Sequence, residues 1–275
     1  MTVLERDGIR SAARVVVKVG SSSISGENAA KVGPIVEALA AAHARGVEVV
    51  LVSSGAIATG MPYLQLESRP SDLATQQAAA AVGQNMLIYR YQDALRPFAI
   101  TAGQVLLTAG DLENPTPRSN ARRAMERLLG LRILPIVNEN DTVATHEIRF
   151  GDNDRLAALV AELIAADALI LLSDIENLYT RPPGEPGAEP LDVIAYGEDL
   201  SALEFGSVVV NSVGTGGAAT KVSAARLAAA AGIGVLVTSA DLVAEALEGG
   251  PVGTWFAPNP VSRPRPVTAA VPIGE

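Results

Sequence analysis

The sequence contains no cysteine, only two histidines, and only three lysines among its 21 basic residues. Without cysteine the chain has no disulfide bonds, no thiolate nucleophile and no sulfur-ligated metal site, which suits a cytoplasmic protein. The histidines, His43 and His146, stand in stretches typical of polar surface positions. Neither is a convincing catalytic base, so the chemistry must be sought in other residue types.

The sequence also lacks a long uninterrupted apolar run and an excess of positive charge. Acidic residues such as Glu162 and Asp167 divide the longest apolar stretch, which argues against a membrane span. The first residues include acids and no long apolar core, which argues against a signal peptide. A net charge of −9 argues against a nucleic-acid surface. We therefore expect a cytoplasmic protein with no membrane or nucleic-acid partner.

The scarcity of lysine makes its positions informative. Where a chain prefers arginine, the remaining lysines mark sites that need a compact ammonium rather than a planar fork. Lys18 ends the apolar run "RVVVK" and precedes Gly-Ser-Ser-Ser, and Lys221 follows the glycine-rich "GTGGAAT". Lys31 lies in a predicted helix and reads as a solvated charge. An acidic protein that binds anions must concentrate positive charge locally, so Lys18 and Lys221 predict a phosphate site.

Short apolar runs alternate with alanine-rich helical patterns along the chain. The predicted strands are Val15–Val19, Val47–Ser53, Ile100–Leu107, Ile133–Asn138, Ala168–Leu172, Val208–Val210 and Val235–Thr238. The predicted helices are Ala29–Arg45, Leu73–Leu95, Arg118–Gly130, Asp152–Ala166, Thr220–Ala231 and Leu242–Leu247. Continuously apolar strands indicate a mainly parallel sheet with both faces covered. We predict an α/β fold, a three-layer αβα sandwich, with one domain over residues 1–258 and a proline-rich tail over residues 259–275.

Four predicted strand or helix ends carry clusters of polar residues. They are Ser53-Ser54-Gly55, Asn138-Glu139-Asn140-Asp141, Ser173-Asp174 and Asp152-Asn153-Asp154. Each alone is explained about equally well as a helix N-cap. Ligands of open parallel sheets collect at the carboxyl ends of the strands, so four such ends together with two lysine loops predict a binding site there.

The glycine-rich segment before Lys221 admits more than one interpretation. Free N–H groups at a helix start favour an anion such as a phosphate. Gly214-x-Gly216-x-x-Ala219 also fits a dinucleotide fingerprint, so an NAD-dependent oxidoreductase is an alternative. That fingerprint normally opens the first βαβ unit, however, whereas this match begins only at Gly214. The oxidoreductase hypothesis also assigns no function to the polar clusters. A non-catalytic nucleotide or amino-acid sensor is a third hypothesis, but it would not need a second lysine and an aspartate.

Taken together, the motifs resemble those of the glutamate 5-kinase family, a branch of the amino acid kinases. The matching stretches include "VVKVGSSS", "VSSGAIATG", "QQAAAAVGQ", "VNENDTVAT", "RFGDNDRLAALVA", "LLSDIENLYT" and "GTGGAATK". They occur in that family's order and span residues 15 to about 231. The combination of NENDTVAT, FGDND and GTGG…TK is specific to this family.

The resemblance implies the amino acid kinase fold and ATP-dependent phosphorylation of the γ-carboxylate of L-glutamate, with Mg²⁺, as the first step of proline biosynthesis. It implies catalytic roles for Lys18, Asp154 and Lys221. It implies nucleotide binding by Lys18, Gly20, Ser173, Asp174, Thr215, Gly216, Gly217, Ala218, Ala219, Thr220 and Lys221. It implies glutamate binding by Ser54, Gly55, Asn138, Asp141 and Asn153, and no residue is assigned as a direct metal ligand.

The inventory of residues agrees with this chemistry. A carboxylate nucleophile is already deprotonated, so no general base is needed, and the obstacle is its repulsion from the triphosphate. The resemblance further implies a homo-oligomer and feedback inhibition by L-proline. Many members of the family continue into a C-terminal PUA domain, which we do not expect here, and often have methionine at the position of Ala218.

Overall fold

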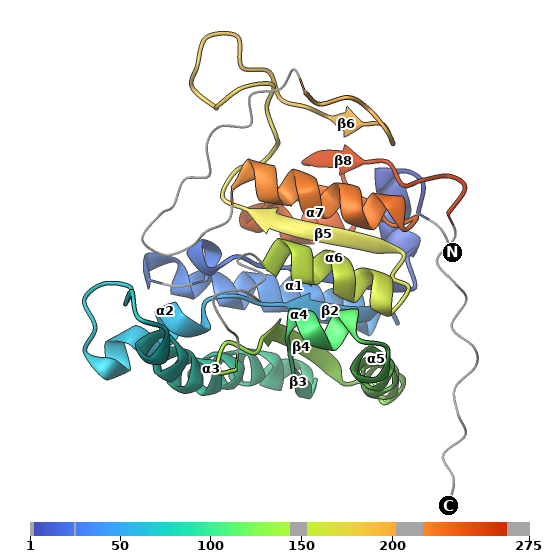
Figure 1. Ribbon diagram of the computed structural model, residues 1–275. Coiled ribbons are helices and arrows are strands. Elements are labelled where there is room, and N and C mark those ends of the chain that lie inside the picture. The colour runs from blue at the N-terminus through green and yellow to red at the C-terminus, as the bar shows by residue number, and fades with distance from the viewer. Residues whose placement is uncertain (1–2, 25, 144–152, 202–216, 263–275) are drawn as a thin grey trace, which may run out of the picture.

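A computed structural model describes residues 3–24, 26–143, 153–201 and 217–262, which form an eight-stranded sheet between layers of helices (Figure 1). The strands are β1 (Arg14–Lys18), β2 (Glu48–Val52), β3 (Ala102–Leu107), β4 (Leu134–Glu139), β5 (Ala168–Ser173), β6 (Val193–Ile194), β7 (Gly234–Ser239) and β8 (Thr254–Phe256). The helices are α1 (Val32–Ala44), α2 (Ala56–Gly60), α3 (Leu73–Leu95), α4 (Ala109–Glu113), α5 (Pro115–Gly130), α6 (Asn153–Leu163), α7 (Ala218–Ala230) and α8 (Val243–Leu247). Short 3₁₀ helices are η1 (Arg6–Ser11), η2 (Ser21–Ser23), η3 (Gly26–Lys31), η4 (Met61–Leu64), η5 (Arg96–Phe98) and η6 (Ala240–Leu242).

The sheet is mainly parallel, as the apolar strands predict. Its order is β3-β4-β2-β1-β5-β7-β8-β6, and only the pair β7–β8 is antiparallel among the described strands. Lys18 lies in register with Val52 of β2 and Leu171 of β5. The carboxyl ends of β4, β2, β1 and β5 therefore lie along one edge of the sheet, where the polar clusters follow them.

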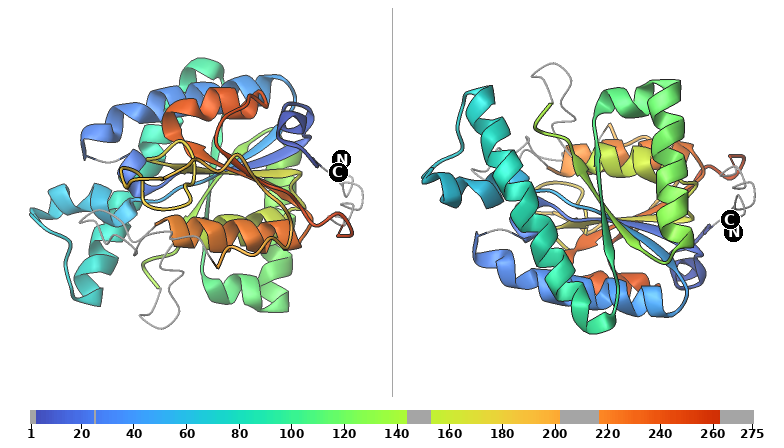
Figure 2. Two further views of the ribbon diagram at one scale, coloured as in Figure 1. Left: turned by 90° about the horizontal axis from the view of Figure 1, so that it is seen from above. Right: turned by 90° about the horizontal axis from the view of Figure 1, so that it is seen from below.

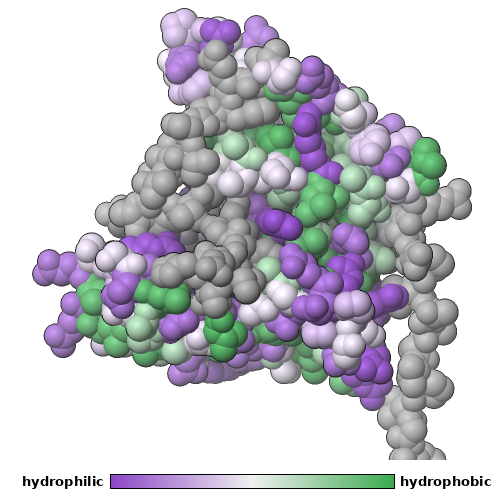
Figure 3. All heavy atoms as spheres, viewed as in Figure 1, coloured by the Kyte–Doolittle hydropathy of each residue, from purple (hydrophilic) through white to green (hydrophobic). Residues whose placement is uncertain are grey.

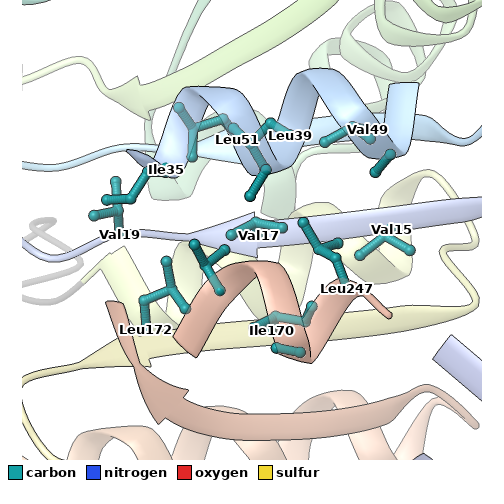
Figure 4. Close-up of a cluster of buried hydrophobic side chains, with 14 of the residues drawn as sticks. Val15, Val17, Val19, Ile35, Leu39, Val49, Leu51, Ile170, Leu172 and Leu247 are labelled. Atoms are coloured by element: carbon teal, nitrogen blue, oxygen red, sulfur yellow. The ribbon is translucent and has the colours of Figure 1, made fainter. Parts of the chain in front are cut away.

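Helices cover both faces of the sheet (Figure 2). On one face, α1, α3 and α8 pack on Val15 and Val17, and Figure 4 shows this cluster with Ile35, Leu39 and Leu247. On the other face, α5, α6 and α7 pack on side chains that include Val16. Successive strand residues point to opposite faces, so every residue of β1 is buried. This burial confirms the predicted three-layer sandwich.

Helices α2 and α3 are packed unusually closely through two glycines. A Cβ atom added to Gly60 would lie 1.9 Å from the Ala79 carbonyl oxygen, and one added to Gly83 would lie 1.8 Å from that of Ala56. Only glycine allows the backbones to approach to this distance. The contact holds the N-terminal half of α3 beside the segment that follows β2, and this matters for the site because both carry polar residues.

The predicted elements differ from the observed ones mainly where segments are short. The bounds of α3 agree with the prediction, whereas α2, α4, β6 and β8 are missed because two to five residues give no clear periodicity. The predicted strand Val208–Val210 lies outside the described residues. None of the described helices is long and apolar enough to cross a membrane. On the face shown in Figure 3, hydrophilic and hydrophobic residues are interspersed.

Candidate active site

Asp154 joins Lys18 and Lys221 at the edge of the sheet where the strands have their carboxyl ends. Lys18 Nζ lies 2.5 Å from Asp154 Oδ1, and Lys221 Nζ lies 3.0 Å from Asp154 Oδ2. All three are buried, with side-chain exposures of 4%, 0% and 8% for Lys18, Asp154 and Lys221. Two ammonium groups thus share the carboxylate of Asp154 in the interior of the protein. Buried charges are costly unless opposite charges compensate them, so a pair of buried ammonium groups suits a bound anion.

The fold explains how residues so distant in sequence meet. Lys18 is the last residue of the central strand β1, and Asp154 is the second residue of α6, which packs beside both β1 and α7. The N-terminus of a helix also favours the negative charge of Asp154. Lys221 lies in the first turn of α7, where its backbone N–H donates to the Gly217 carbonyl oxygen at 3.3 Å.

The start of α7 adds polar groups beside the lysines. The Gly217 N–H donates to Thr220 Oγ1 at 3.1 Å, and Thr220 Oγ1 lies 3.3 Å from Asp154 Oδ2. Ala218 and Ala219 are the first residues of this thirteen-residue helix. The N–H groups of a first helical turn have no partners within the helix and favour an anion. Thr215 and Gly216 lie outside the described residues.

Three of the five residues predicted for the glutamate site, Ser54, Asn138 and Asn153, meet in one hydrogen-bond network. Asn153 Nδ2 lies 2.7 Å from the Ser53 carbonyl oxygen, 3.0 Å from Ser54 Oγ and 2.9 Å from Asn138 Oδ1. Asn138 Nδ2 donates to Gln84 Oε1 at 2.7 Å. The network therefore connects the ends of β2 and β4, the start of α6 and the middle of α3. Asn153 is adjacent in sequence to Asp154, so it also joins this network to the lysines.

A buried tyrosine supports the network from behind. Tyr91 on α3 is fully buried, and its hydroxyl lies 2.9 Å from Ser53 Oγ. Burial raises the pKa of Tyr91 above its ordinary value, while the hydrogen bond with Ser53 opposes part of that rise. Tyr91 therefore remains neutral at physiological pH and holds the end of β2 against α3.

A cavity of about 270 Å³ lies between α3, β3 and the turn that follows β4. Its lining includes Gln84, Gln104, Glu139 and Asp141. Asp141 and Gln84 therefore line the same cavity, and Gln84 is hydrogen-bonded to Asn138. Two acidic side chains in one cavity suit an ammonium group.

The remaining predicted residues lie along the same sheet edge. Ser173 ends β5, and its Oγ donates to Asp174 Oδ1 at 3.2 Å, while Asp174 itself is exposed. Gly20 follows β1, and a Cβ added there would lie 3.8 Å from Lys18 Nζ. Gly55 has a φ of 89°, a left-handed conformation that glycine adopts without strain, and it leads from β2 into α2.

His43 lies away from this edge. Its Nε2 is 3.1 Å from the Arg132 carbonyl oxygen, and burial first, then the charge of Arg132, lowers its pKa. His146 lies outside the described residues.

Two residues of the network carry no role in the sequence analysis, Gln84 and Tyr91, whereas Ser53 belongs to one of the predicted polar clusters. Gln84 stands in the alanine-rich stretch "QQAAAAVGQ", where an amide among small residues was the available signal. The sequence around Tyr91 gave no signal of a role in the site, because a buried tyrosine in a helix usually only fills the core. Among the described residues, no group of three or more histidine, aspartate or glutamate side chains could hold a metal ion. Both oxygens of Asp154 already contact ammonium groups.

Comparisons with known proteins agree with this geometry. Residues 13–239 match the model of the amino acid kinase family. The glutamate 5-kinase of Clavibacter sepedonicus is 70% identical over 259 residues, which cover 94% of this chain and 100% of that protein. The glutamate 5-kinase of Leifsonia xyli subsp. xyli is 70% identical over 258 residues, covering 94% and 96%.

Solved structures show the same fold at low identity. The carbamate kinase from Giardia lamblia bound to AMP-PNP aligns with a TM-score of 0.67 and 18% identity, covering 91% of this chain and 100% of that one. The oxidoreductase and sensor hypotheses gain no support from these likenesses. The chain belongs to the amino acid kinase family and, within it, to the glutamate 5-kinases.

Proposed function

We propose that the chain transfers the γ-phosphoryl group of ATP to the γ-carboxylate of L-glutamate, forming L-glutamyl 5-phosphate and ADP in the first step of proline synthesis. A carboxylate oxygen forms a bond to the γ-phosphorus, and the bond from that phosphorus to the β–γ bridging oxygen breaks. The glutamate γ-carboxylate is ionised at neutral pH, so no proton is transferred and no histidine is required. The observation that carries the proposal is the buried bridge of Lys18 and Lys221 by Asp154.

The two lysines address the main electrostatic obstacle. One pair of like unit charges ~4 Å apart costs roughly 4 kcal/mol at an effective dielectric constant of ~20. Lys18, Lys221 and the first N–H groups of α7 place positive charge where the carboxylate approaches the triphosphate. Asp154 acts as a positioning residue, because it fixes both ammonium groups before the substrates arrive. Thr215, Gly216, Gly217, Ser173 and Asp174 complete the proposed nucleotide site.

Glutamate would bind on the other side of Asn153. Ser54, Asn138 and Asn153 supply hydrogen-bonding groups, and Asp141 supplies a carboxylate for the α-ammonium. Mg²⁺ would be carried by the triphosphate, where it would neutralise phosphate charge, because such ions usually bind one or two carboxylates together with phosphates. The two buried lysines and the start of α7 fit the phosphates, and Asp174, exposed just after the carboxyl end of β5, is the carboxylate that we propose for the ion.

The experiment that tests the proposal is an incubation with ATP, Mg²⁺, hydroxylamine and candidate acids. Hydroxylamine converts an acyl phosphate into a hydroxamate, which is measured by colour with ferric ion. We expect hydroxamate from L-glutamate and little from N-acetylglutamate, because acetylation removes the ammonium that Asp141 would hold. Equal turnover of the two acids would contradict the assignment of Asp141. No hydroxamate from any acid would contradict the kinase proposal itself.

We also propose a homo-oligomer located in the cytoplasm and inhibited by L-proline. These three properties rest on the resemblance to the family. Light scattering of the purified chain measures the first, and fractionation of cells the second. Titration of the hydroxamate assay with L-proline tests the third, and unchanged rates at millimolar L-proline would contradict it.

A further inference from the structure

The side-chain amides of Asn153, Asn138 and Gln84 are hydrogen-bonded in series, and Gln84 is the last of them. Two backbone groups, the Glu139 N–H and the Ser53 carbonyl, determine how these amides are oriented. The Glu139 N–H can only donate, and it lies 2.9 Å from Asn138 Oδ1, so the oxygen of Asn138 must face it. Asn138 Nδ2 therefore points to Gln84, and the atom that accepts from it must be Oε1. The Ser53 carbonyl can only accept, which orients Asn153 in the same way. The orientation of the Gln84 amide thus follows from its neighbours.

This orientation leaves the NH₂ group of Gln84 available. Gln84 is 8% exposed and lines the cavity that also contains Glu139 and Asp141. Its Oε1 is engaged by Asn138, and its Nε2 makes no hydrogen bond to the part of the chain that the structure describes. Gln84 Nε2 is not one of the fully buried polar atoms that lack a partner, so it keeps contact with the cavity. An NH₂ group that opens on a cavity can donate to an acceptor supplied by a ligand.

The chemistry of the cavity identifies that acceptor. Asp141 and Glu139 suit an α-ammonium, but an α-amino acid also brings an α-carboxylate, which needs a hydrogen-bond donor rather than another carboxylate. The γ-carboxylate must lie towards Lys18 and Lys221, and the hydrogen bonds from Asn153 to Asn138 and from Asn138 to Gln84 lead away from these lysines. The end of the substrate nearest Gln84 is thus the α end. A donor is needed there, and the Gln84 NH₂ group is a donor of fixed direction.

We propose that Gln84 is a specificity-determining residue that donates a hydrogen bond from Nε2 to the α-carboxylate of glutamate. The inference rests on the proposed glutamate kinase function and adds the residue that recognises the amino-acid end of the substrate. A substitution of Gln84 can test this role, because the loss of a purely structural residue would change kcat/KM equally for all substrates.

Gln84→Glu tests the proposal with little change in shape. The new carboxylate can still accept the hydrogen bond from Asn138, but it cannot donate and it repels an α-carboxylate. Hydrogen bonds to charged groups are strong enough that we expect KM for glutamate to rise about 10- to 100-fold with kcat much less affected. The melting-temperature increase given by ADP with Mg²⁺ should match that of the parent protein, which shows that the variant is folded.

Asn85→Asp is the matched control. Asn85 is the next residue, it lines the same cavity, and it is exposed. The substitution adds the same charge to the same cavity without removing the proposed donor. We expect KM for glutamate to rise clearly less than in Gln84→Glu, because the proposed donor is intact and the charge of an exposed side chain is screened by solvent.

The decisive readout is the discrimination against 4-aminobutyrate, which is glutamate without its α-carboxylate. The parent protein should prefer glutamate strongly in kcat/KM, and Gln84→Glu should reduce that preference at least tenfold, whereas Asn85→Asp should retain it. If Gln84→Glu keeps the parent KM and preference while the parent phosphorylates glutamate, the role of Gln84 is wrong and the proposed function stands. If the parent protein does not phosphorylate glutamate, both are wrong.

Discussion

Lys221 of α7 and Asp154 of α6 form a buried ion pair of 3.0 Å whose aspartate also binds Lys18, so one carboxylate fixes two cations at a single point. Each ammonium contacts a different oxygen of that carboxylate. Loss of any member of this group should therefore alter the positions or charges of the others. The first two predictions concern this group.

We predict that Lys221→Met reduces turnover by ~10²–10³, the usual effect of removing one preorganised electrostatic partner. Methionine keeps most of the stem and removes the charge. The dissociation constant for ATP should change far less, because Lys18 and the start of α7 remain. The matched control is Lys31→Met, since Lys31 forms a surface pair with Asp241 and should contribute nothing to turnover. Near-normal turnover in Lys221→Met would show that the charge of Lys221 has a structural role and does not contribute to catalysis.

We predict that Asp154→Asn destabilises the protein in the absence of ligand. The substitution leaves two buried ammonium groups without their shared carboxylate, and breaking a buried pair typically costs about 3–5 kcal/mol. Phosphate or sulfate at millimolar concentration should restore part of the melting temperature, because an anion replaces the missing charge. The same salts should affect the parent protein less. A variant as stable as the parent without added anion would show that the pair contributes no stability.

We predict that the hydroxyl group of Tyr91 makes stability fall at alkaline pH. Because its pKa is raised in the folded protein, the folded state keeps the proton after the unfolded chain has lost it. This contribution is complete below the unfolded value of about 10 and declines above it by about 1.4 kcal/mol per pH unit. Tyr91→Phe lacks this contribution, so its melting temperature should fall less steeply above pH 10. The hydrogen bond to Ser53 should make Tyr91→Phe about 1 kcal/mol less stable at pH 7. Parallel curves for the two proteins would contradict the raised pKa.

We predict that Gly83→Ala disrupts the contact between α2 and α3. The added Cβ would lie 1.8 Å from the Ala56 carbonyl oxygen, so the two helices must separate. Gly83 directly precedes Gln84, and KM for glutamate should therefore rise together with a loss of stability. The control is Gly33→Ala in α1, where an added Cβ meets nothing within 4 Å. That substitution should be neutral or stabilise by up to ~1 kcal/mol. Equal melting temperatures for both variants would show that α2 and α3 are not in close contact.

The sequence predicted the layers and the main site residues for physical reasons that can be stated. Apolar strands such as Val15–Val19 reveal burial on both faces, and the carboxyl ends of parallel strands must share an edge. The scarcity of lysine pointed to Lys18 and Lys221. The joining of these lysines by Asp154 was implied by the family resemblance alone, because an ion pair between residues 67 positions apart leaves no local pattern.

Other features could not be predicted because they depend on packing between distant segments. The Gln84–Asn138 hydrogen bond joins α3 to β4, and the Tyr91–Ser53 bond joins α3 to the end of β2. Both depend on the position of α3, which its close contact with α2 through Gly60 and Gly83 helps to fix. In the sequence, glycines near an alanine-rich helix indicate only a tolerated irregularity.

The central claim is that a carboxylate oxygen of glutamate attacks the γ-phosphorus of ATP. Isotope transfer measures this most directly. Glutamate labelled with ¹⁸O in its γ-carboxylate is incubated with the protein, ATP and Mg²⁺, and the acyl phosphate is cleaved at its carbonyl carbon by hydroxylamine. The account predicts that each phosphate released in proportion to hydroxamate carries one ¹⁸O atom, detected by mass spectrometry. Unlabelled phosphate formed with ADP would show that water, and not glutamate, accepts the phosphoryl group, and would contradict the account.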